Sequence, residues 1–259
     1  MTFEEFKARY EKMPVEEFPN NVLQAVPKPI VSFRVSTYMH AQYIRQCLDG
    51  ILMQQTTFPY EIVIGEDEST DGTREICIEY AKRYPDKIRL FLHKRGNNIK
   101  IDGQPTPKFQ GIYSMYMCRG KYQAMCEGDD YWTDPYKLQK QVDFLENNPD
   151  YGLVHTDLDH YYVNNGRYVK NHWEKEGVTN QSGDLYEALL GGEKSMIYGC
   201  TTCFRRELIL DIDSEKFSKY MAGDVALWLH ISSRSKIGYI NESTAVRNLL
   251  NHSATQGRD

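Results

Sequence analysis

Apolar residues recur with two different periods along the first half of the chain. Residues 30–36, 60–65 and 88–92 are short runs rich in β-branched and other apolar side chains, which is the pattern of buried strands. Apolar positions spaced by three and four follow the first two runs, at Ile44, Cys47, Leu48, Ile51 and Leu52 and then at Cys77, Tyr80, Ala81 and Tyr84. This spacing is typical of a helix that lies on a sheet. The pattern therefore predicts strand, helix, strand, helix and strand in succession.

The alternation continues to residue 132. A polar loop over residues 94–108, with glycines and prolines, precedes a helical run and a buried strand over residues 122–126. The helical run has apolar positions at Phe109, Ile112, Tyr113 and Tyr116. Strands that alternate with helices build a doubly wound, mainly parallel sheet with helices on both faces. The predicted fold class is therefore α/β, with a Rossmann-like sheet.

Outside this region the pattern is less regular. Phe3, Phe6 and Tyr10 have helical spacing over residues 2–13, and prolines follow, so residues 1–28 are predicted to be a helical lead-in. The second half is predicted to contain a helix from Pro135 to Asn147, strands over residues 153–156 and 196–205, a hairpin around Asn165-Gly166, a short helix near Leu208, a helix beginning at Gly223, and closing strands over residues 236–240 and 245–247.

Composition excludes several classes of protein. The chain has 259 residues, enough for one large domain, and a net charge of -5 with its lysines and arginines scattered. A surface that binds nucleic acid is therefore not expected. No apolar run approaches the ~20 residues that span a bilayer. We expect a soluble, cytoplasmic protein, with peripheral docking on the inner face of the membrane as the alternative.

The six cysteines lie mostly in apolar runs, and we expect them to be reduced core residues. Cys200-Thr201-Thr202-Cys203 has the C-x-x-C spacing of a zinc half-site or a redox pair. Because no second pair and no nearby histidine completes a tetrahedral site, a structural role is favoured.

The candidate chemistry is concentrated after the strand over residues 122–126. Glu127, Asp129 and Asp130 follow it around Gly128, at the carboxyl edge where open α/β sheets bind ligands. Crowded carboxylates repel one another unless a cation lies among them, and oxygen ligands suit Mg²⁺ or Mn²⁺, ions that usually accompany phosphates. A solvated acidic turn is the alternative.

Four further carboxylates follow the strand over residues 60–65, and two of them, Asp67 and Asp71, are considered for separate roles. Asp67 lies on the strand side of the turn, where it could accept a hydrogen bond from a ligand N–H, whereas Asp71 is favoured as a cap of the next helix. The sequence has no G-x-G-x-x-G after the first strand and no G-x-x-x-x-G-K-[ST]. Rossmann-type dinucleotide sites and P-loop sites are therefore not expected.

Four segments together resemble the family 2 glycosyltransferases, which have the GT-A fold. They are Val35-Ser36-Thr37-Tyr38, Ile64-Gly65-Glu66-Asp67-Glu68-Ser69-Thr70-Asp71-Gly72-Thr73, Glu127-Gly128-Asp129-Asp130-Tyr131-Trp132 and Gly223-Asp224-Val225-Ala226-Leu227-Trp228-Leu229. Their order and spacing match over residues 28–250, nearly the whole chain. The resemblance implies a single GT-A domain over residues 29–259, with a nucleotide-binding half over residues 29–132 and an acceptor half over residues 133–259.

The resemblance also implies a reaction. The donor would be a nucleotide-diphosphate sugar, with a UDP-sugar expected, and the cofactor would be Mg²⁺ or Mn²⁺. The sugar would pass with inversion to a hydroxyl of a carbohydrate or lipid-linked acceptor, in the synthesis of a surface polysaccharide or glycan. By position in the motifs, the residues implied to bind the nucleotide sugar are Thr37, Tyr38, Asp67, Glu127, Gly128, Asp130 and Trp132.

Individual roles follow from the same resemblance. Thr37 and Tyr38 would line the nucleoside pocket, Asp67 would accept a base N–H, and Glu127 would approach the ribose. Asp129 would bind the metal, and Asp224 would be the catalytic base. A bound metal stabilises a diphosphate leaving group, and a carboxylate base activates a sugar hydroxyl, so the chemistry needs these residue types. Asp224 could alternatively cap its helix.

The match is not complete. Glu127 stands where many relatives have Asp, Glu68 where many have Gly, and Gly223 where another acid often precedes the base. His252 matches a C-terminal position where such enzymes often carry a histidine that closes over the diphosphate, which implies a second metal ligand. A lone surface histidine is the alternative, and Arg247 could equally serve.

Two other functions remain open. A nucleotidyltransferase also uses carboxylate-bound Mg²⁺, but it would show a glycine-rich loop with a lysine or arginine after the first strand. Ser36-Thr37-Tyr38-Met39-His40 has neither. A catalytically silent nucleotide-sugar-binding protein is disfavoured by the intact acids, and a transfer assay separates it from an enzyme.

Overall fold

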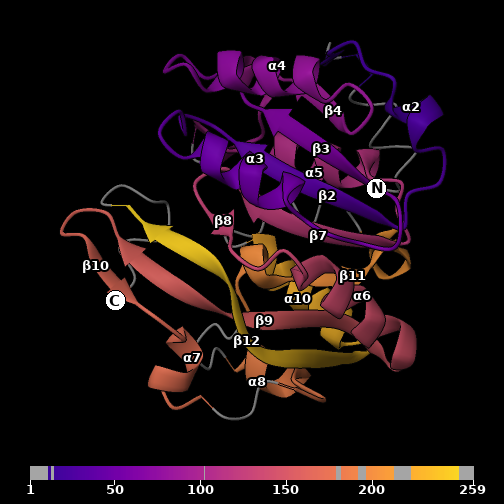
Figure 1. The fold of residues 1–259 in the computed structure, drawn as a ribbon, viewed down its shortest axis with the longest axis vertical. Helices are drawn as coiled ribbons and strands as arrows, with labels where there is room; N and C mark the ends of the chain where they lie inside the picture. Colours follow the sequence, from indigo (N-terminus) through magenta and orange to yellow (C-terminus); the bar gives the residue numbers. More distant parts are fainter. Residues whose placement is uncertain are drawn as a thin grey trace.

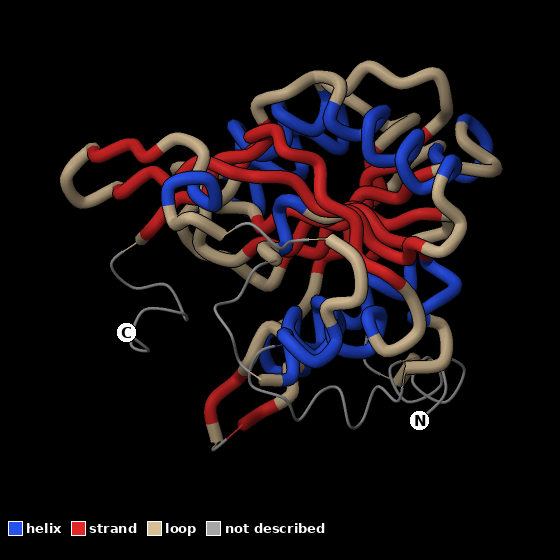
Figure 2. The backbone as a smooth tube through the Cα atoms, turned by 90° about the horizontal axis from the view of Figure 1, so that it is seen from below, coloured by secondary structure: helices blue, strands red, loops and turns tan. Residues whose placement is uncertain are grey.

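The computed structural model describes residues 11–12, 15–101, 103–178, 182–191, 197–212 and 223–250. One sheet of ten strands organises this part of the chain, with helices on both faces (Figures 1 and 2). The strands are β1 (Glu16–Glu17), β2 (Val31–Thr37), β3 (Tyr60–Glu66), β4 (Ile88–Leu92), β7 (Tyr122–Glu127), β8 (Tyr131–Trp132), β9 (Tyr151–Tyr162), β10 (Arg167–Val169), β11 (Cys203–Arg205) and β12 (Lys236–Leu249). They are hydrogen-bonded in the order β1-β4-β3-β2-β7-β11-β9-β12-β8, and β10 pairs with β9.

The helices connect and cover these strands. They are α2 (Val22–Ala25), α3 (Ile44–Leu52), α4 (Thr73–Arg83), α5 (Lys108–Met117), α6 (Lys137–Asn147), α7 (His172–Lys175), α8 (Tyr186–Leu190) and α10 (Gly223–Ser232). Three short 3₁₀ turns are η1 (Arg95–Asn97), η2 (Gly199–Thr201) and η3 (Arg206–Ile209), and a separate two-stranded ribbon pairs β5 (Lys100–Ile101) with β6 (Gln104–Pro105).

The first half follows the predicted alternation. Strands β4, β3, β2 and β7 are parallel neighbours, and α3, α4 and α5 lie between them along the chain. The prediction of a mainly parallel, doubly wound sheet is therefore confirmed. Most of the predicted helix over residues 2–13 lies outside the described residues, and β1 adds an antiparallel edge strand beside β4.

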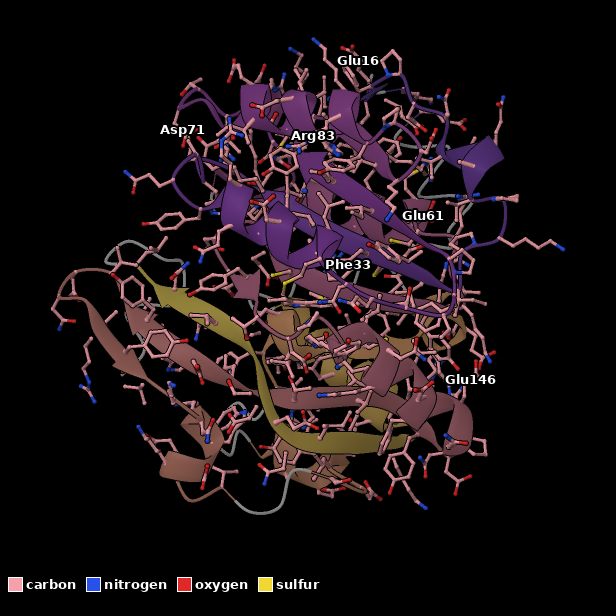
Figure 3. All side chains as sticks on the ribbon, in the orientation of Figure 1. Glu16, Phe33, Glu61, Asp71, Arg83 and Glu146 are labelled. Carbon is pink, nitrogen blue, oxygen red and sulfur yellow. The ribbon has the colours of Figure 1, made fainter. Side chains whose placement is uncertain are left out.

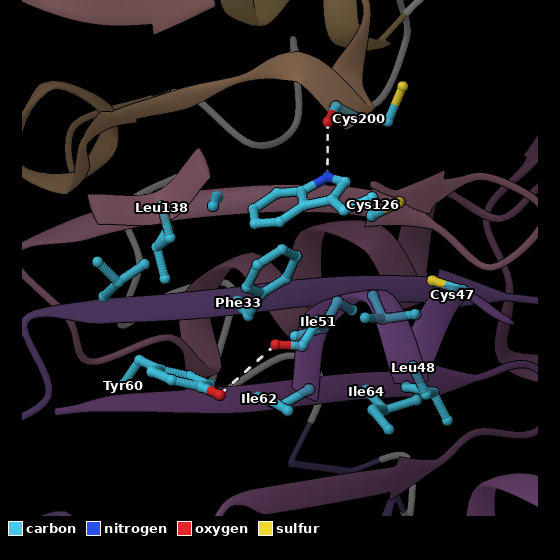
Figure 4. Close-up of a cluster of buried hydrophobic side chains, with 14 of the residues drawn as sticks. Phe33, Cys47, Leu48, Ile51, Tyr60, Ile62, Ile64, Cys126, Leu138 and Cys200 are labelled. Atoms are coloured by element: carbon cyan, nitrogen blue, oxygen red, sulfur yellow. Dashed lines mark hydrogen bonds between the residues drawn. The ribbon is translucent and has the colours of Figure 1, made fainter. Parts of the chain in front are cut away.

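Side chains that alternate along the strands divide the core between the two faces of the sheet. Val31, Phe33 and Val35 of β2 pack with α3, α4 and α6 on one face. Met125, Phe204 and their neighbours pack with α5, α8 and α10 on the other. Phe33 lies near the centre of the molecule (Figure 3), and Figure 4 shows the surrounding cluster. Each fully buried side chain of this size contributes about 1.5–3 kcal/mol through removal from water.

The second half extends the same sheet in a different way. β11 is antiparallel to both β7 and β9, and β12 is parallel to β9. The predicted helices near Pro135, Leu208 and Gly223 and the hairpin around Asn165-Gly166 are confirmed. Among the residues that the structure describes, no helix has the length and apolar character needed to cross a bilayer.

Two strand predictions in this half differ from the structure, the first in its extent and the second in its division into two strands. The strand expected over residues 196–205 is confined to β11, and η2 precedes it. The Thr201 and Thr202 hydroxyls donate to the carbonyls of Tyr198 and Gly199, at 2.7 and 2.9 Å, which favours a turn over a ladder. The two closing strands are one strand, β12, with irregular register between Ile240 and Val246. These irregularities disturb the apolar alternation and hide its continuity in the sequence.

Candidate functional site

The carboxyl ends of three neighbouring parallel strands meet at one edge of the sheet. The arrows of β2, β3 and β7 point the same way in Figure 1. The Gly128 N–H donates to the carbonyl of Ser36 at 2.9 Å, and the Asp67 N–H donates to the carbonyl of Thr37 at 3.2 Å. Backbone hydrogen bonds therefore hold the loops after β3 and β7 against the end of β2.

Gly128 is required by this close approach. A Cβ atom at Gly128 would lie 2.5 Å from Thr37 Oγ1 and 2.9 Å from His40 Nδ1, and real contacts essentially never reach such distances. Thr37 Oγ1 and His40 Nδ1 are themselves 3.2 Å apart. The glycine thus allows the acidic loop to pack directly on the turn that follows β2.

Asp129 is the carboxylate of this loop whose oxygens could still bind a ligand. Its side chain is 19% exposed, and the ion-pair contact that the structure gives it is His40 Nε2 at 3.9 Å. Within the described part of the chain, no hydrogen bond is donated to its carboxylate oxygens. Burial lowers the pKa of His40, while the charge of Asp129 opposes this shift, so the imidazole tends to be neutral.

The donor set around Asp129 fits a hard divalent ion that is shared with a ligand. No group of three or more His, Cys, Asp or Glu side chains forms a metal cluster among the described residues. Mg²⁺ is usually held by one or two carboxylates together with waters and substrate phosphates, and a dedicated protein cage is not needed. An oxygen donor that accepts no hydrogen bond suits that arrangement. His252, the other predicted metal ligand, lies outside the described residues.

Glu127 ends β7 and faces the side of the sheet covered by α5 and α10. Burial raises its pKa, the guanidinium of Arg34 opposes this, and the charges of Asp129 and Asp224 add to it. Both Arg34 and Asp224 therefore act on Glu127. A Cβ atom at Gly199 would lie 3.1 Å from each Glu127 carboxylate oxygen, so η2 also approaches this side chain closely.

Asp130 and Trp132 have structural positions. Asp130 is 7% exposed, and its Oδ1 accepts the Asn248 N–H at 2.9 Å, which fastens the end of β12 to the loop. Burial, with the charges of Asp129 and Glu127, raises the pKa of Asp130 well above its usual range. Trp132 is 2% exposed and donates its indole N–H to the Cys200 carbonyl at 2.7 Å (Figure 4). The Trp132 side chain therefore packs in the core, and its place among the residues that bind a nucleotide sugar stays a prediction.

Asp67 is buried and fully paired. Arg95 Nη1 lies 2.7 Å from Asp67 Oδ2, and Asn98 Nδ2 donates to both carboxylate oxygens at 2.8 Å. Burial raises the pKa of Asp67, while Asn98 and Arg95 oppose the shift. The guanidinium of Arg95 also lies over the ring of Tyr38, 3.8 Å from its centroid.

Asp71 and Asp224 both lie at the start of a helix, but their side chains bond differently. Asp71 Oδ1 accepts the Thr73 N–H at 3.1 Å, and Oδ2 accepts the Ala41 N–H at 3.0 Å, so the capping role predicted for Asp71 is confirmed. Figure 3 shows Asp71 at the outer end of its loop. Asp224 is exposed in the first turn of α10, and its Oδ1 accepts the adjacent Val225 N–H at 3.0 Å. A capping aspartate bonds to an N–H two or three residues further on, so Asp224 does not make that bond.

Comparison with known proteins identifies the family. Residues 27–252 match the family described as "Glycosyltransferase like family 2". The chain belongs to this family.

Curated relatives of this glycosyltransferase family match part of the chain. An uncharacterized protein of Mycobacterium tuberculosis is 46% identical over 114 residues, which are 44% of this chain and 31% of the relative. The Bacillus subtilis protein TuaG, named for teichuronic acid biosynthesis, is 28% identical over 118 residues, which are 46% of this chain and 42% of the relative. The matched region thus spans about a third to two fifths of these relatives' length.

Solved structures show the GT-A fold. S. aureus TarS 1-349 in complex with UDP-GlcNAc has a TM-score of 0.59 and 18% identity, with 88% of this chain and 61% of that chain covered. The mannosyltransferase PcManGT from Pyrobaculum calidifontis, in complex with GDP-Man and Mn²⁺, has a TM-score of 0.57 and 20% identity, with 94% and 62% covered. At this identity the likeness establishes the fold.

Several residues of this family 2 site were not found from the sequence. His40 and Arg34 act on Asp129 and Glu127, and Arg95 and Asn98 pair with Asp67. The one available signal was Arg34, a charged residue inside an apolar strand, since its side chain must find a partner when buried. Arg95 and Asn98 lie in a polar loop whose path no sequence pattern predicts.

Cys200 and Cys203 are buried free thiols, in agreement with the structural role predicted for them. Burial raises the pKa of Cys203 to about 12, so it is held as a thiol rather than a reactive thiolate. The Cys200 carbonyl serves the fold by accepting the Trp132 indole N–H.

Proposed function

We propose that this family 2 chain is an inverting, metal-dependent glycosyltransferase that uses a nucleotide-diphosphate sugar. The observation that carries the proposal is the accessible Asp129 carboxylate, which accepts no hydrogen bond from the described residues and lies beside Glu127 at the edge where three parallel strands end. The proposal is supported by TarS and PcManGT, whose structures contain UDP-GlcNAc and GDP-Man, respectively.

The nucleoside would lie between the ends of β2 and β3. In this proposal the base stacks on Tyr38 and donates an N–H to Asp67, and Thr37 lies beneath it. Glu127 would contact the ribose. Because burial raises the pKa of Glu127, its carboxyl group is more readily protonated than an exposed one and could donate to a ribose hydroxyl.

Asp129 would hold Mg²⁺ or Mn²⁺ together with the two phosphates. When bound, such an ion supplies Lewis-acid stabilisation of the charge that develops on the diphosphate leaving group. Asp129 itself contributes one carboxylate ligand. PcManGT, which was solved with Mn²⁺, supports the choice of ion.

Asp224 would accept the proton of the attacking hydroxyl. The bond from the sugar anomeric carbon to the diphosphate oxygen breaks as the bond from the acceptor oxygen forms, and the acceptor proton passes to Asp224. One base and a single displacement give inversion at the anomeric carbon. The effect of the Asp224 charge on Glu127 and Arg34 supports this position at the same site.

The acceptor would be a hydroxyl of a growing glycan or of a lipid-linked sugar. This part of the proposal rests on the name of TuaG, a relative that is assigned to teichuronic acid biosynthesis. The acceptor half that would bind it comprises residues 133–259.

The first prediction tests the metal and donor site. Asp129→Ala should remove most of the Mn²⁺-dependent affinity for UDP or GDP, because it removes the carboxylate ligand while leaving the loop backbone. Isothermal titration calorimetry with UDP and GDP, with and without Mn²⁺, measures this. Asp86→Ala is the control, since Asp86 is an exposed acid in the turn before β4, at the opposite edge of the sheet. Undiminished Mn²⁺-dependent affinity in Asp129→Ala would contradict the assignment.

A further inference from the structure

Arg95 occupies the place proposed for the nucleobase. Its guanidinium lies over the Tyr38 ring, 3.8 Å from the centroid, and Nη1 lies 2.7 Å from Asp67 Oδ2. A base in the proposed site would make the same two contacts, a stack on Tyr38 and an N–H bond to Asp67. One side chain therefore makes both of the contacts that are proposed for the base.

The chemistry of a guanidinium explains this mimicry. The group is planar, stacks on aromatic rings and carries N–H donors at its edge. A nucleobase with a ring N–H has the same three properties. The charge of the guanidinium also compensates the buried Asp67 carboxylate, which would otherwise be costly to keep ionised.

Glu68 fastens Arg95 in this position. Glu68 Oε2 accepts the Arg95 backbone N–H at 2.9 Å, and its Oε1 lies 3.2 Å from Lys94 Nζ. Glu68 has a φ of 59°, in the left-handed region that is uncommon for residues other than glycine. The Glu68 carboxylate is thus the group that ties η1 to the base site.

The surroundings of Arg95 would allow its side chain to leave Asp67. The Arg95 side chain is 25% exposed, whereas that of Asp67 is 1% exposed, so the guanidinium lies on the open side of the pair. Asn98 Nδ2 stays on both oxygens of Asp67 if Arg95 leaves. Asp67 would therefore keep one donor while a base replaces the other.

We propose that Arg95 is an exchangeable plug of the base site, held by Glu68 and displaced when the nucleobase of the donor binds. The inference rests on the proposed function, because it takes Tyr38 and Asp67 as the base site. Displacement lowers apparent affinity, since only the fraction of molecules with Arg95 released is competent to bind. The plug also keeps the buried Asp67 paired until a base with an N–H donor arrives.

The test measures nucleotide affinity when the plug is removed or loosened. Isothermal titration calorimetry with UDP and GDP in Mn²⁺ is performed on the parent, Arg95→Ala and Glu68→Gly. Arg95→Ala should bind at least about threefold more tightly than the parent, because the competent fraction rises. Glu68→Gly should shift affinity in the same direction by less. It retains Arg95 and Asp67, and glycine suits the φ at that position, so misfolding is not expected to obscure the result.

Arg45→Ala is the matched control. Arg45 pairs with Glu79 and lies over the ring of Tyr80, 5.9 Å from its centroid, so it makes the same types of contact on α3 and α4. Its substitution should leave nucleotide affinity unchanged. Weaker binding by Arg95→Ala would overturn the proposal and make Arg95 a residue that holds the base. Equal binding by Arg95→Ala and the parent would overturn it as well.

Asp67→Ala separates this inference from the proposed function. If the donor site is correct and the plug is not, Asp67→Ala weakens binding while Arg95→Ala fails to tighten it. If the donor site itself is wrong, UDP and GDP bind neither the parent nor Arg95→Ala, and both proposals are overturned. Binding by Arg95→Ala but not by the parent would support both.

Discussion

The carboxylates of the site differ in surroundings, and this decides what each can do. Asp130 is buried beneath Asn248, and Asp67 is paired with Arg95 and Asn98. Asp129 is partly exposed, and within the described ranges its carboxylate has one ion-pair contact, the long one with His40. Ordinary turn chemistry would not require this gradation. An acid that stays open beside buried acids is the group most able to hold a cation.

At the residue scale, the second prediction concerns Asp224. Asp224→Asn should lower the rate of sugar transfer by about 10²- to 10⁴-fold, because the amide cannot accept the proton of the acceptor. Donor affinity should be retained, since Asp224 does not contact the nucleotide in the proposed site. Transfer assays with a panel of UDP-sugars and GDP-mannose identify the donor, and the rates are then compared.

Asp184→Asn is the control for a loss caused by the helix terminus alone. Asp184 Oδ1 accepts the Tyr186 N–H at 3.3 Å, so it bonds to the first turn of α8. Asn caps about as well as Asp, so Asp184→Asn should keep its stability. Asp224 is exposed and makes no capping bond, so Asp224→Asn should keep its stability as well. Transfer by Asp224→Asn within a few-fold of the parent rate would rule out the base assignment.

At the element scale, a buried lysine ties α6 to η2. Lys137 is fully buried, and its Nζ donates to Gln141 Oε1 at 2.7 Å and to the Thr201 carbonyl at 2.9 Å. The same ammonium lies over the ring of Trp132, 4.3 Å from its centroid. η2 in turn brings Gly199 against Glu127. The lysine therefore connects the core to the position of a site carboxylate.

The third prediction follows from the titration of this lysine. Burial lowers the pKa of Lys137 to about 7, whereas an unfolded lysine titrates near 10.4. Between these values the unfolded chain binds a proton that the folded chain has lost, so the contribution to stability rises with pH, by at most about 1.4 kcal/mol per unit. Below pH 7 the cost of burying the charge is fully present.

Urea denaturation at several pH values between 7 and 10 measures this contribution. In Lys137→Met, the rise in free energy of unfolding with pH should be smaller than in the parent. Buried thiols act in the opposite direction, because their raised pKa values make the free energy of unfolding fall as pH rises. Both proteins contain these thiols, so the difference between their two slopes removes most of this contribution. Lys140→Met should keep the parent slope, because Lys140 is part-exposed and paired with Asp134. Equal slopes for parent and Lys137→Met would contradict the prediction.

Elements with a strong local period could be predicted from the sequence, and those that depend on distant partners could not. The apolar stripe of α3 and the apolar runs of β2 and β3 are patterns of neighbouring residues, so the local sequence predicts these elements. β8 has two residues and exists because Trp132 and Tyr131 pair with Ala245 and Val246. No local pattern predicts such a pairing.

The candidate site could likewise be predicted from the sequence only in part. The acids after β3 and β7 could be placed at one edge because parallel strands end together, and the structure brings them there. Arg95 lies 28 residues from Asp67 in a polar loop, so only the folded chain shows their pairing. Trp132 neighbours the acids in the sequence, but strand alternation turns its ring into the core.

At the scale of the whole molecule, the two halves share one sheet. β11 pairs with β7 of the first half and with β9 of the second, so backbone hydrogen bonds run from one half to the other without interruption. One core cluster also contains residues of both halves, including Leu48 and Leu158. Neither half can lose its structure without exposing apolar surface of the other.

The fourth prediction is that the two halves unfold together in a single thermal transition. Leu48→Ala in α3 and Leu153→Ala in β9 should each cost about 2–5 kcal/mol, because each deletes a fully buried side chain from a different cluster. Both should lower the same melting temperature, by about 2–4 °C per kcal/mol for a chain of this size. Differential scanning calorimetry of the two variants and the parent measures the number of transitions. Leu23→Ala is the control, because Leu23 is 56% exposed and its truncation should leave the melting temperature unchanged. Two separate transitions, one lowered by Leu48→Ala and the other by Leu153→Ala, would show that the halves are independent domains despite their common sheet.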